Sequence, residues 1–328
     1  MSEQRKVVVT DYTFPALDAE RAAAEGAGAL FQAHQCRTAE DVAAAIRGAS
    51  VAVVQFAPVT AAAIEGLAAG AALIRYGIGF DNIDVAAATA AGHPVGYVPD
   101  YCIDEVAEHT CAALLSMLRK LPALDASVRG GTWAAVAVAK PLKPFADTMI
   151  GFFGFGQIGR AVQGKLKGFG FRFAVADPAL SADEAATLGV ELMGADALFA
   201  NADAISLHAP ATPATRHFIN RDRLAGMQPH AVIVNSARGA LIDEDALAEA
   251  LVAGRIGGAA LDVFEAEPLS PDSSLRKAPN ALLTPHAAWY SEAAIGRLQR
   301  LVADDIASHL AKQPLRRPVP GALGVASS

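Results

Sequence analysis

The segment from Thr148 to Asp177 constrains the fold of this chain more than any other part of the sequence. An apolar run, Met149–Phe153, passes directly into Gly154-Phe-Gly-Gln-Ile-Gly159, and a helical pattern follows. A second apolar run, Phe171–Ala176, then ends at Asp177. A strand, a glycine-rich turn, a helix and a second strand in this order are typical of a parallel βαβ unit that binds a dinucleotide.

The three glycines of this turn have separate physical tasks. Gly154 permits a tight turn, Gly156 lets the backbone approach a pyrophosphate, and Gly159 lets the helix pack against the strand. The N-terminus of the helix offers free N–H groups and the positive end of its dipole to the phosphates. A glycine turn that serves packing alone is the alternative, and the full order of elements makes it the weaker one.

Asp177 bears on which dinucleotide binds. Its carboxylate can accept hydrogen bonds from the adenosine ribose hydroxyls, and it would repel a 2′-phosphate. The following segment, Pro178–Glu184, contains no Lys or Arg that could bind such a phosphate. We therefore expect NAD as the cofactor rather than NADP. The alternative is that Asp177 only caps a turn before Pro178.

Length and composition exclude several classes of protein. The chain has 328 residues, 53% of them hydrophobic, so we expect about two domains with large cores. A net charge of −7 argues against nucleic acid and anionic membranes as partners. No apolar stretch approaches the roughly 20 residues of a membrane span, and the N-terminus lacks a signal-peptide core, so we expect a cytoplasmic protein. Cys36, Cys102 and Cys111 lack metal-type spacing, so we expect reduced thiols and no metal.

Short apolar runs alternate with alanine-rich helical patterns along most of the chain, which indicates βαβ units. The first set of expected strands comprises Lys6–Thr10, Val51–Gln55, Leu73–Tyr76 and Pro94–Val98. The second set comprises Met149–Phe153, Phe171–Ala176, Ala204–Leu207, Ala231–Asn235, Ala259–Asp262 and Ala281–Thr284. We therefore predict an α/β protein with two Rossmann-like domains, each built on a parallel sheet.

Two helical patterns suggest how these domains are connected. The stretch Asp104–Leu121 has more apolar positions than one stripe, so we expect it to be buried on several sides, between the domains or in a subunit interface. A helix over Ser291–Leu310 can cross back to the first domain, and Pro314–Ser328 is expected to be an irregular tail. We therefore predict a substrate-binding domain of residues 1–101 and 295–328, with an NAD-binding domain, residues 102–294, inserted in it.

Three polar segments follow predicted strands of the second domain and can supply the protein's part in hydride transfer. Arg238 follows one strand, and its guanidinium can hold a carboxylate at two points. Glu265 and Glu267 follow the next strand. His286 ends the last one, and histidine is the side chain best suited to proton transfer near neutral pH. A Glu hydrogen-bonded to this His would hold its tautomer.

Each of these residues also has an ordinary alternative. An arginine or a glutamate after a strand is usually solvated, and a lone histidine is more often structural than catalytic. The carboxyl ends of parallel strands meet at the sheet edge where ligands bind, so the three groups together favour a site.

These motifs together resemble those of the D-isomer-specific 2-hydroxyacid dehydrogenases, and the resemblance spans 6–314. Its six segments are Arg75-Tyr-Gly-Ile-Gly-Phe-Asp-Asn-Ile-Asp84, Gly154-Phe-Gly-Gln-Ile-Gly159, Ser206-Leu-His-Ala-Pro210, Asn235-Ser-Ala-Arg-Gly239, Leu261-Asp-Val-Phe-Glu-Ala-Glu-Pro268 and Thr284-Pro-His286. The resemblance implies a catalytic set of Arg238, Glu267 and His286, because the family's carboxylate directly precedes the proline. It also implies a flavodoxin-like first domain and a homodimer built on a helix and arm at about residues 102–147.

The resemblance extends to the residues that bind cofactor and substrate. The implied cofactor contacts are Thr110, Gly154, Phe155, Gly156, Gln157, Ile158, Gly159, Asp177, Pro178, His208, Ala209, Pro210, Thr215, Ser236, Ala237, Arg238, Asp262, His286 and Ala288. Asp262 can accept a hydrogen bond from the nicotinamide carboxamide. The implied substrate contacts are Phe56, Arg75, Tyr76, Gly77, Ile78, Arg238, His286 and Trp289.

Two features refine the expected substrate and branch. Trp289 is an aromatic residue three positions after His286, and in this the sequence resembles the C-terminal-binding-protein branch of the family. The alternative is that Trp289 is an ordinary aromatic residue of the core. Phosphoglycerate dehydrogenases usually have Arg-Ser where this chain has Gln55-Phe56. The expected pocket wall of Phe56, Tyr76, Ile78 and Trp289 is mostly apolar, and an unpartnered phosphate dianion would be costly there.

We therefore expect a small non-phosphorylated 2-hydroxy or 2-keto acid as substrate, held in a cleft between the domains. An NAD(H)-sensing co-regulator with little turnover is the alternative from another class of protein. Formate-type oxidation within the same superfamily is a weaker third possibility, because a wide apolar wall does not suit so small a substrate.

Overall fold

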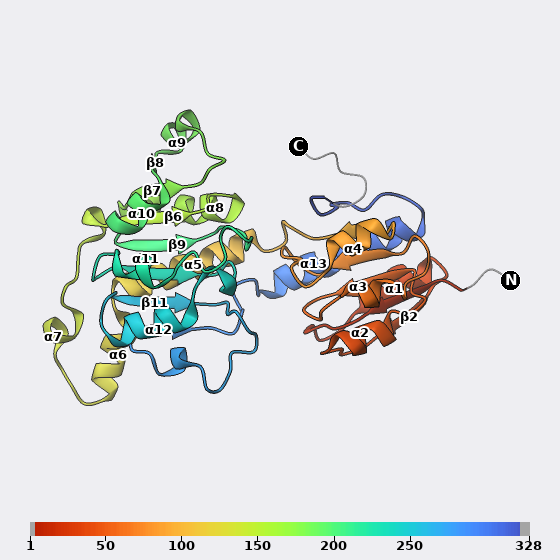
Figure 1. Cartoon of the computed structure of the whole chain (residues 1–328), viewed down its shortest axis with the longest axis horizontal. Helices are drawn as coiled ribbons and strands as arrows, with labels where there is room; N and C mark the ends of the chain where they lie inside the picture. The colour runs from red at the N-terminus through yellow and green to blue at the C-terminus, as the bar shows by residue number, and fades with distance from the viewer. Residues whose placement is uncertain (1–3, 322–328) are drawn as a thin grey trace. The chain divides into compact units, whose positions relative to one another are not determined.

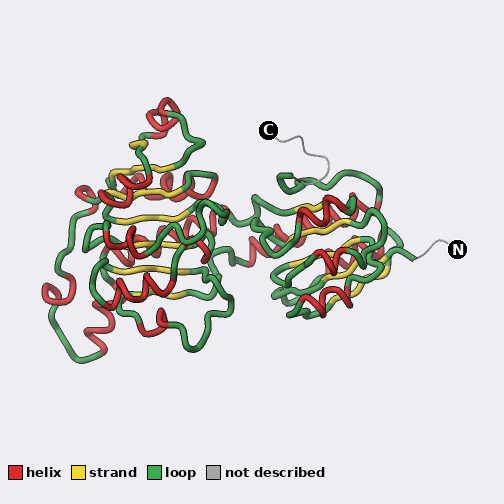
Figure 2. Tube along the Cα trace, viewed as in Figure 1, coloured by secondary structure: helices red, strands yellow, loops and turns green. Residues whose placement is uncertain are grey.

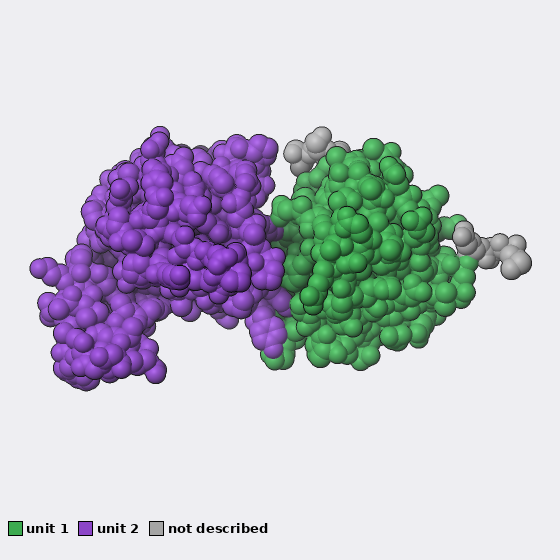
Figure 3. Space-filling view, turned by 60° about the horizontal axis from the view of Figure 1, so that its bottom comes forward, with its two compact units in different colours: residues 1–102, 291–328 green, residues 103–290 purple. Residues whose placement is uncertain are grey.

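The protein is described here by a computed structural model, in which residues 4–321 are placed well enough to describe. The chain divides into two compact units (Figure 3): unit 1 comprises 1–102 and 291–328, and unit 2 comprises 103–290. The sequence pattern had put these boundaries after residues 101 and 294. The second crossing falls at Ser291, whose hydroxyl accepts from Ala294 N and caps helix α13, Glu292–Leu310.

Unit 1 contains a five-stranded parallel sheet in the order β2-β1-β3-β4-β5. Its strands are β1 Lys6–Val9, β2 Leu30–Ala33, β3 Val51–Val54, β4 Ala72–Arg75 and β5 Val95–Gly96. Its helices are α1 Asp18–Gly26, α2 Ala39–Ala45, α3 Ala61–Ile64, α4 Val85–Ala90 and α13 (Figure 1). The 2-1-3-4-5 order is that of flavodoxin-like sheets, as predicted.

The core of unit 1 explains why these segments fold this way. Strand β3 is buried on both faces, as expected of an unbroken apolar run in a parallel sheet. Helices α2 to α4 bury small and branched residues against it, including Val42, Ile46 and Ile64. Helices α1 and α13 pack together, and α13 also contacts β4. The sheet is therefore covered by helices from the two ends of the chain.

The strand β2 was not predicted from the sequence. Its four residues, Leu-Phe-Gln-Ala, lie at the edge of the sheet, and three of the four are exposed. An edge strand buries little apolar surface, so it leaves a weak signal in the sequence. The two-residue strand β8, Glu191–Leu192, at the edge of the other sheet was missed for the same reason.

The described part of the C-terminal segment is not an irregular tail. Residues 317–319 run antiparallel to β5: Tyr97 N donates to Arg317 O at 3.0 Å, and Val319 N donates to Val95 O at 2.9 Å. Val319 is fully buried among the residues of the unit 1 core. The prediction was therefore wrong for this stretch, and residues 322–328 lie outside the described part of the chain.

Unit 2 contains a seven-stranded parallel sheet in the order β12-β11-β10-β9-β6-β7-β8. Figure 2 draws the strands of both sheets in yellow. Besides β8, its strands are β6 Met149–Phe153, β7 Arg172–Ala176, β9 Ala204–Leu207, β10 Val232–Asn235, β11 Gly258–Leu261 and β12 Ala281–Leu283. The order reverses between β6 and β9, as in dinucleotide-binding sheets. The predicted α/β class with two parallel sheets is confirmed.

Helices cover both faces of this sheet. They are α5 Ile103–Leu118, α6 Leu121–Arg129, α7 Ala135–Ala139, α8 Gln157–Leu166, α9 Ala182–Leu188, α10 Ala195–Asn201, α11 Arg221–Ala225 and α12 Glu244–Val252. One core cluster joins α5, α8 and α9 to the sheet, and another joins α10, α11 and α12 to its other face. Among residues 4–321, no helix is long and apolar enough to cross a membrane.

The predicted helical stretch Asp104–Leu121 corresponds to helix α5, and only its last residue belongs to α6. Lys120 has a φ of 52°, and this left-handed residue separates α5 from α6. Helix α5 packs on β9, β10, β11 and α8, which accounts for its several apolar faces within unit 2. Helices α6 and α7 lie outside the layers of this unit (Figure 1). We call 121–147 the arm.

Candidate functional site

The glycine turn after β6 has the geometry that its sequence predicted. Gly154 has a φ of 83°, and a Cβ there would lie 2.6 Å from Ala209 N. A Cβ on Gly159 would lie 3.3 Å from Gly154 O, so helix and turn are in close contact. A Cβ on Gly156 would meet nothing within 4 Å, and no side chain caps α8. The open backbone at Gly156 and the uncapped helix fit a pyrophosphate.

Asp177 is bound to this turn by its carboxylate. Phe155 N donates to Oδ2 at 2.6 Å, and Ala179 N donates to Oδ1 at 2.8 Å. Asp177 therefore does cap a turn after β7, as the alternative interpretation proposed. Since a carboxylate can accept about four hydrogen bonds, it retains capacity for ribose hydroxyls. The two roles are compatible.

His208 lies behind the glycine turn. Its ring stacks on Phe152 with 5.8 Å between centroids, and its Nε2 lies 2.8 Å from Ser206 Oγ. Burial lowers the pKa of His208 to about 4. The imidazole is therefore neutral at pH 7 and adds no positive charge near the expected phosphate position.

Glu267 and His286 are hydrogen-bonded partners in unit 2. His286 Nδ1 lies 2.7 Å from Glu267 Oε2, and Phe264 N donates to Oε1 at 2.9 Å. Burial raises the pKa of Glu267, but its hydrogen bond with His286, the charge of that ring, Phe264 N–H and Arg238 outweigh burial and hold the pKa below its usual value. An ionised Glu267 requires a proton on His286 Nδ1, which leaves Nε2 for proton exchange.

The structure distinguishes the two glutamates that the sequence offered. The carboxylate of Glu265 binds the guanidinium of Arg216 and the ring of His217. Glu267, the residue before Pro268, is the partner of His286.

The loop that carries Arg238 is held by a residue that sequence reasoning did not single out. The buried side chain of Asn235 donates from Nδ2 to Arg238 O at 2.8 Å and accepts from Ala237 N at 3.0 Å. Gly239, the residue after Arg238, packs so closely against Phe264 that a Cβ on Gly239 would overlap the backbone of Phe264. The Arg238 loop therefore lies directly against the loop that leads to Glu267.

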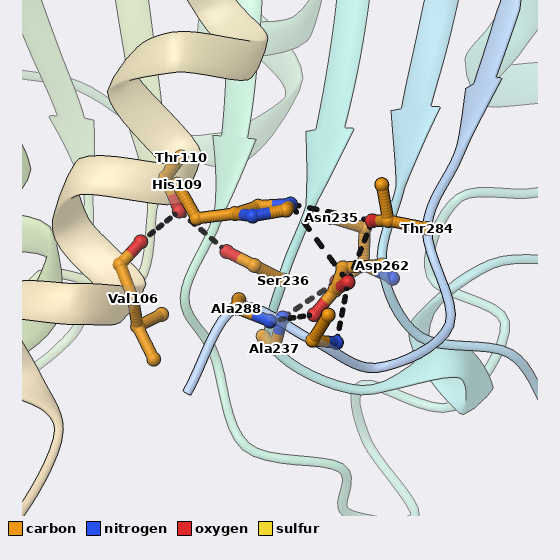
Figure 4. Close-up of polar contacts among 10 residues, drawn as sticks. Val106, His109, Thr110, Asn235, Ser236, Ala237, Asp262, Thr284 and Ala288 are labelled. Atoms are coloured by element: carbon orange, nitrogen blue, oxygen red, sulfur yellow. Dashed lines mark hydrogen bonds and ion pairs between the residues drawn. The ribbon is translucent and has the colours of Figure 1, made fainter. Parts of the chain in front are cut away.

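Asp262 accepts hydrogen bonds from the turn around His286 (Figure 4). Thr284 Oγ1 and Ala287 N donate to Oδ1 at 2.6 and 2.9 Å, and Ala288 N donates to Oδ2 at 2.9 Å. His286 N donates to Asp262 O at 2.7 Å. These contacts support His286 at a φ of 52°, a conformation that non-glycine residues rarely adopt. Most of the acceptor capacity of Asp262 is therefore used by the protein itself.

Helix α5 contributes two further residues to this region (Figure 4). Thr110 Oγ1 lies 2.6 Å from Ser236 Oγ, which brings together two expected cofactor residues from distant parts of the chain. His109 Nε2 lies 3.2 Å from Thr284 Oγ1. Because the Thr284 hydroxyl donates its proton to Asp262, it must accept from His109, so Nε2 of that ring carries the proton.

In unit 1, a buried aspartate that sequence reasoning missed shapes the loop after β3. Asp11 Oδ1 accepts from Gln55 N at 3.0 Å, and Oδ2 accepts from Phe56 N at 2.6 Å and from Ala57 N at 3.1 Å. The Phe56 side chain is 42% exposed, and the Arg75 guanidinium lies over its ring at 5.7 Å. An aromatic ring and a cation are thus presented together in this unit.

Tyr76 does not line a pocket wall, which corrects the sequence prediction. Its side chain is 1% exposed, its ring packs on Phe14, and its hydroxyl donates to Glu20 Oε1 at 2.8 Å. Burial raises the pKa of Glu20, although Tyr76 and Gln299 partly offset this with hydrogen bonds. The tyrosine is a core residue. Ile78 and Trp289 are both partly exposed.

Comparison with known proteins identifies the family. A family model described as "D-isomer specific 2-hydroxyacid dehydrogenase, NAD binding domain" matches residues 111–288, more than half of the chain. The chain belongs to this family. The match also assigns NAD binding to unit 2, as the glycine turn and Asp177 predicted.

The named relatives of this chain agree with its membership of the 2-hydroxyacid dehydrogenase family. The D-3-phosphoglycerate dehydrogenase of Mycobacterium tuberculosis is 41% identical over 237 residues, which are 72% of this chain and 44% of that protein. The glyoxylate reductase of Korarchaeum cryptofilum is 36% identical over 251 residues, 76% of each chain. A solved glyoxylate reductase from "Paecilomyes thermophila" has a TM-score of 0.84 at 27% identity and covers 98% of this chain and 99% of that one.

The match covers about half or less, 44 to 51%, of the length of the phosphoglycerate dehydrogenases. The relatives named here are enzymes of other branches, so the expected placement beside the C-terminal-binding proteins is not supported and only family membership stands.

The buried position of Tyr76 generates a prediction about the stability of this protein. Tyr76→Phe should lower the free energy of unfolding by about 2 kcal/mol, because Glu20 loses a hydrogen bond in the core. The loss should be larger at pH 8 than at pH 5, because acid protonates a glutamate whose pKa is raised. Urea unfolding at both pH values measures this; Leu30→Ala, which alters an exposed side chain of the same unit outside the expected site, is the control. A changed KM for the 2-keto acid with unaltered stability would restore Tyr76 to the substrate site.

The close packing at Gly239 generates a second prediction. Gly239→Ala should push the Arg238 loop away from the Glu267 loop, because a methyl group has no room beside Phe264. We expect kcat/KM for the 2-keto acid to fall by about 10²-fold, since small misplacements of catalytic groups are costly, while NADH affinity changes little. Steady-state kinetics and NADH fluorescence titration measure the two effects; Gly226→Ala, where a Cβ has ordinary contacts, is the control.

Proposed function

We propose that the protein is an NAD-dependent D-2-hydroxyacid dehydrogenase that acts on a small, non-phosphorylated 2-hydroxy or 2-keto acid. The observation that carries the proposal is the Glu267–His286 hydrogen bond, which leaves Nε2 of the imidazole for proton transfer. Arg238 lies in the loop packed against the loop of Glu267 and contributes to the lowered pKa of that carboxylate. A cation and a proton carrier together suit a substrate that has a carboxylate beside a carbonyl.

The residues have the following roles in the proposed reduction. NADH, when bound at the glycine turn, supplies the hydride that adds to C2 of the 2-keto acid. The Arg238 guanidinium holds the substrate carboxylate and polarises the carbonyl. His286 donates a proton from Nε2 to the carbonyl oxygen, and Glu267 stabilises the imidazolium before that transfer. In oxidation His286 accepts the hydroxyl proton, and the charge that it gains is balanced by Glu267.

Asp262 and Asn235 act on the backbone around these groups. Asp262 holds the residues on either side of His286, and Asn235 holds those on either side of Ala237 and Arg238. Both side chains are buried, so they can fix the loops without competing for substrate. We therefore assign them positioning roles.

The preference for a non-phosphorylated acid rests on unit 1. The loop that carries Phe56 is held by Asp11, a buried carboxylate whose negative charge disfavours a phosphate nearby. Arg75 supplies one guanidinium beside Phe56, which suits a single carboxylate better than a phosphate dianion. The glyoxylate reductase among the relatives supports a small 2-keto acid.

We predict that a panel of acids separates these possibilities. NADH oxidation should be efficient with small 2-keto acids such as glyoxylate and pyruvate, and NAD reduction should be slow with 3-phosphoglycerate. Absorbance at the reduced nicotinamide band measures both directions. Efficient turnover of 3-phosphoglycerate with inert small acids would reverse the substrate assignment, and no turnover of any acid would favour the NAD(H)-sensing alternative.

We predict that His286→Ala lowers kcat by about 10²- to 10⁴-fold, the usual contribution of general acid–base catalysis. NADH affinity should remain within a few-fold of wild type, because the glycine turn and Asp177 are unchanged. The matched control is His34→Ala, which removes an exposed histidine of unit 1. Near-normal turnover in the His286 variant would reject this residue as the proton carrier.

We also propose that the protein forms a homodimer through the arm. Several of its apolar side chains are exposed in the single chain, Trp133 at 90% and Val136 at 78%. Large apolar groups at such exposure are typical of an interface. We predict that Trp133→Ser with Val136→Asp gives a monomer in analytical ultracentrifugation. Val252→Asp changes an exposed apolar residue outside the arm and should leave the assembly unchanged.

A further inference from the structure

A cluster of charged residues lies beside the proposed catalytic loop and is not used in the mechanism above. Glu265 contacts the Arg216 guanidinium, and both of its carboxylate oxygens lie 3.1 Å from His217 Nε2. Glu265 N donates to Glu244 Oε1 at 2.6 Å. The cluster therefore joins residues from the loop after β9, the start of α12 and the loop after β11.

These segments carry the expected cofactor and catalytic groups. The loop after β9, 210–217, contains the expected cofactor residues Pro210 and Thr215. It is tied to the Arg238 loop by backbone hydrogen bonds, His217 N to Ala240 O at 2.8 Å and Ile219 N to Leu241 O at 3.0 Å. Glu265 lies two residues before Glu267 in the loop after β11. Its side chain thus connects the cofactor side of the site to the catalytic side.

The backbone at His217 indicates that this connection is specific. His217 has a φ of 47°, a conformation uncommon outside glycine, and it turns the ring toward Glu265. Thr215 Oγ1 donates to Pro210 O at 2.6 Å and accepts from Thr212 N at 2.8 Å, so the loop before it is also ordered by its own side chains. Because the loop is ordered, the contact of His217 with Glu265 at its end also affects the positions of Pro210 and Thr215, the expected cofactor residues.

The charges around the catalytic pair give a second reason for the cluster. Glu244, Glu265 and Glu267 bring three carboxylates together. Burial and the charges of Glu265, Asp245 and Glu267 raise the pKa of Glu244, although the Glu265 N–H partly offsets this. An unpaired Glu265 would compete with Glu267 for nearby cations. In the structure Glu265 instead binds Arg216 and His217.

We propose that Glu265 is a positioning residue: by binding Arg216 and His217 it fastens the 210–217 loop to the catalytic loop and so supports cofactor binding and the Glu267–His286 pair. The proposal deepens the proposed dehydrogenase function and rests on it for the role of Glu267. Its first readout, NADH affinity, does not require turnover. Failure of the proposal can therefore be told apart from failure of the function.

The test uses the intact protein and measures NADH affinity by fluorescence titration, then kcat and the KM for NADH. Glu265→Gln should weaken NADH binding by about 3- to 10-fold, the upper range for a partly exposed ion pair in a network, and should change kcat by less. Glu265→Arg combined with Arg216→Glu should recover most of the affinity, because the pair is restored with reversed charges. The matched control is Glu249→Gln, which removes the partner of Arg221 in an exposed ion pair elsewhere on unit 2.

The outcomes decide the proposal. Loss of NADH affinity in Glu265→Gln at unchanged stability, with recovery in the reversed pair, supports it. Wild-type affinity in Glu265→Gln overturns it, and so does a reversed pair that is folded but no tighter than the single variant. If Glu265→Gln loses stability in thermal unfolding, the reversed pair decides; a reversed pair that also fails to fold overturns the proposal, because Glu265 then serves stability alone.

Discussion

The parallel arrangement of the strands is the constraint on which the rest of this structure depends. Every strand of unit 2 runs in the same direction, so the segments after β6, β9, β10, β11 and β12 leave the sheet at one edge. The glycine turn, Arg238, Glu267 and His286 are far apart in sequence and are all found after such strand ends. A small shift of register in any strand would move a functional loop relative to the others, and the buried apolar runs fix that register.

Buried carboxylates then hold the loops that leave these edges. Asp262 in unit 2 and Asp11 in unit 1 each accept hydrogen bonds from backbone N–H groups of a neighbouring loop. A loop at a strand end lacks partners for its N–H groups, and an ionised carboxylate satisfies several of them at once. The hydrogen bonds that stabilise each loop also fix the position of one of its residues. This residue is His286 in the loop held by Asp262 and Phe56 in the loop held by Asp11.

The sequence predicted most of the fold, because strong local signals accompany most of its elements. Continuous apolar runs such as Met149–Phe153 and Ala204–Leu207 are the observed strands β6 and β9. The prediction failed where stability comes from distant partners. Strand β2 lies at a sheet edge with three of its four residues exposed, and Val319 is buried in the core where its N–H pairs with Val95 O. Tyr76 was predicted to line a pocket, but its side chain is buried and its hydroxyl donates a hydrogen bond to Glu20.

The choice between Glu265 and Glu267 shows how the candidate site depends on such distant contacts. Both glutamates leave the same strand, and residue type alone does not separate them. Glu267 gains His286 from 19 residues further along the chain, and Glu265 gains Arg216 from 49 residues before it. Both carboxylates face an imidazole, but that of Glu267 lies 2.7 Å from His286, whereas that of Glu265 is shared between His217 and the Arg216 guanidinium. Glu265, with a permanent cation beside it, is better suited to joining loops.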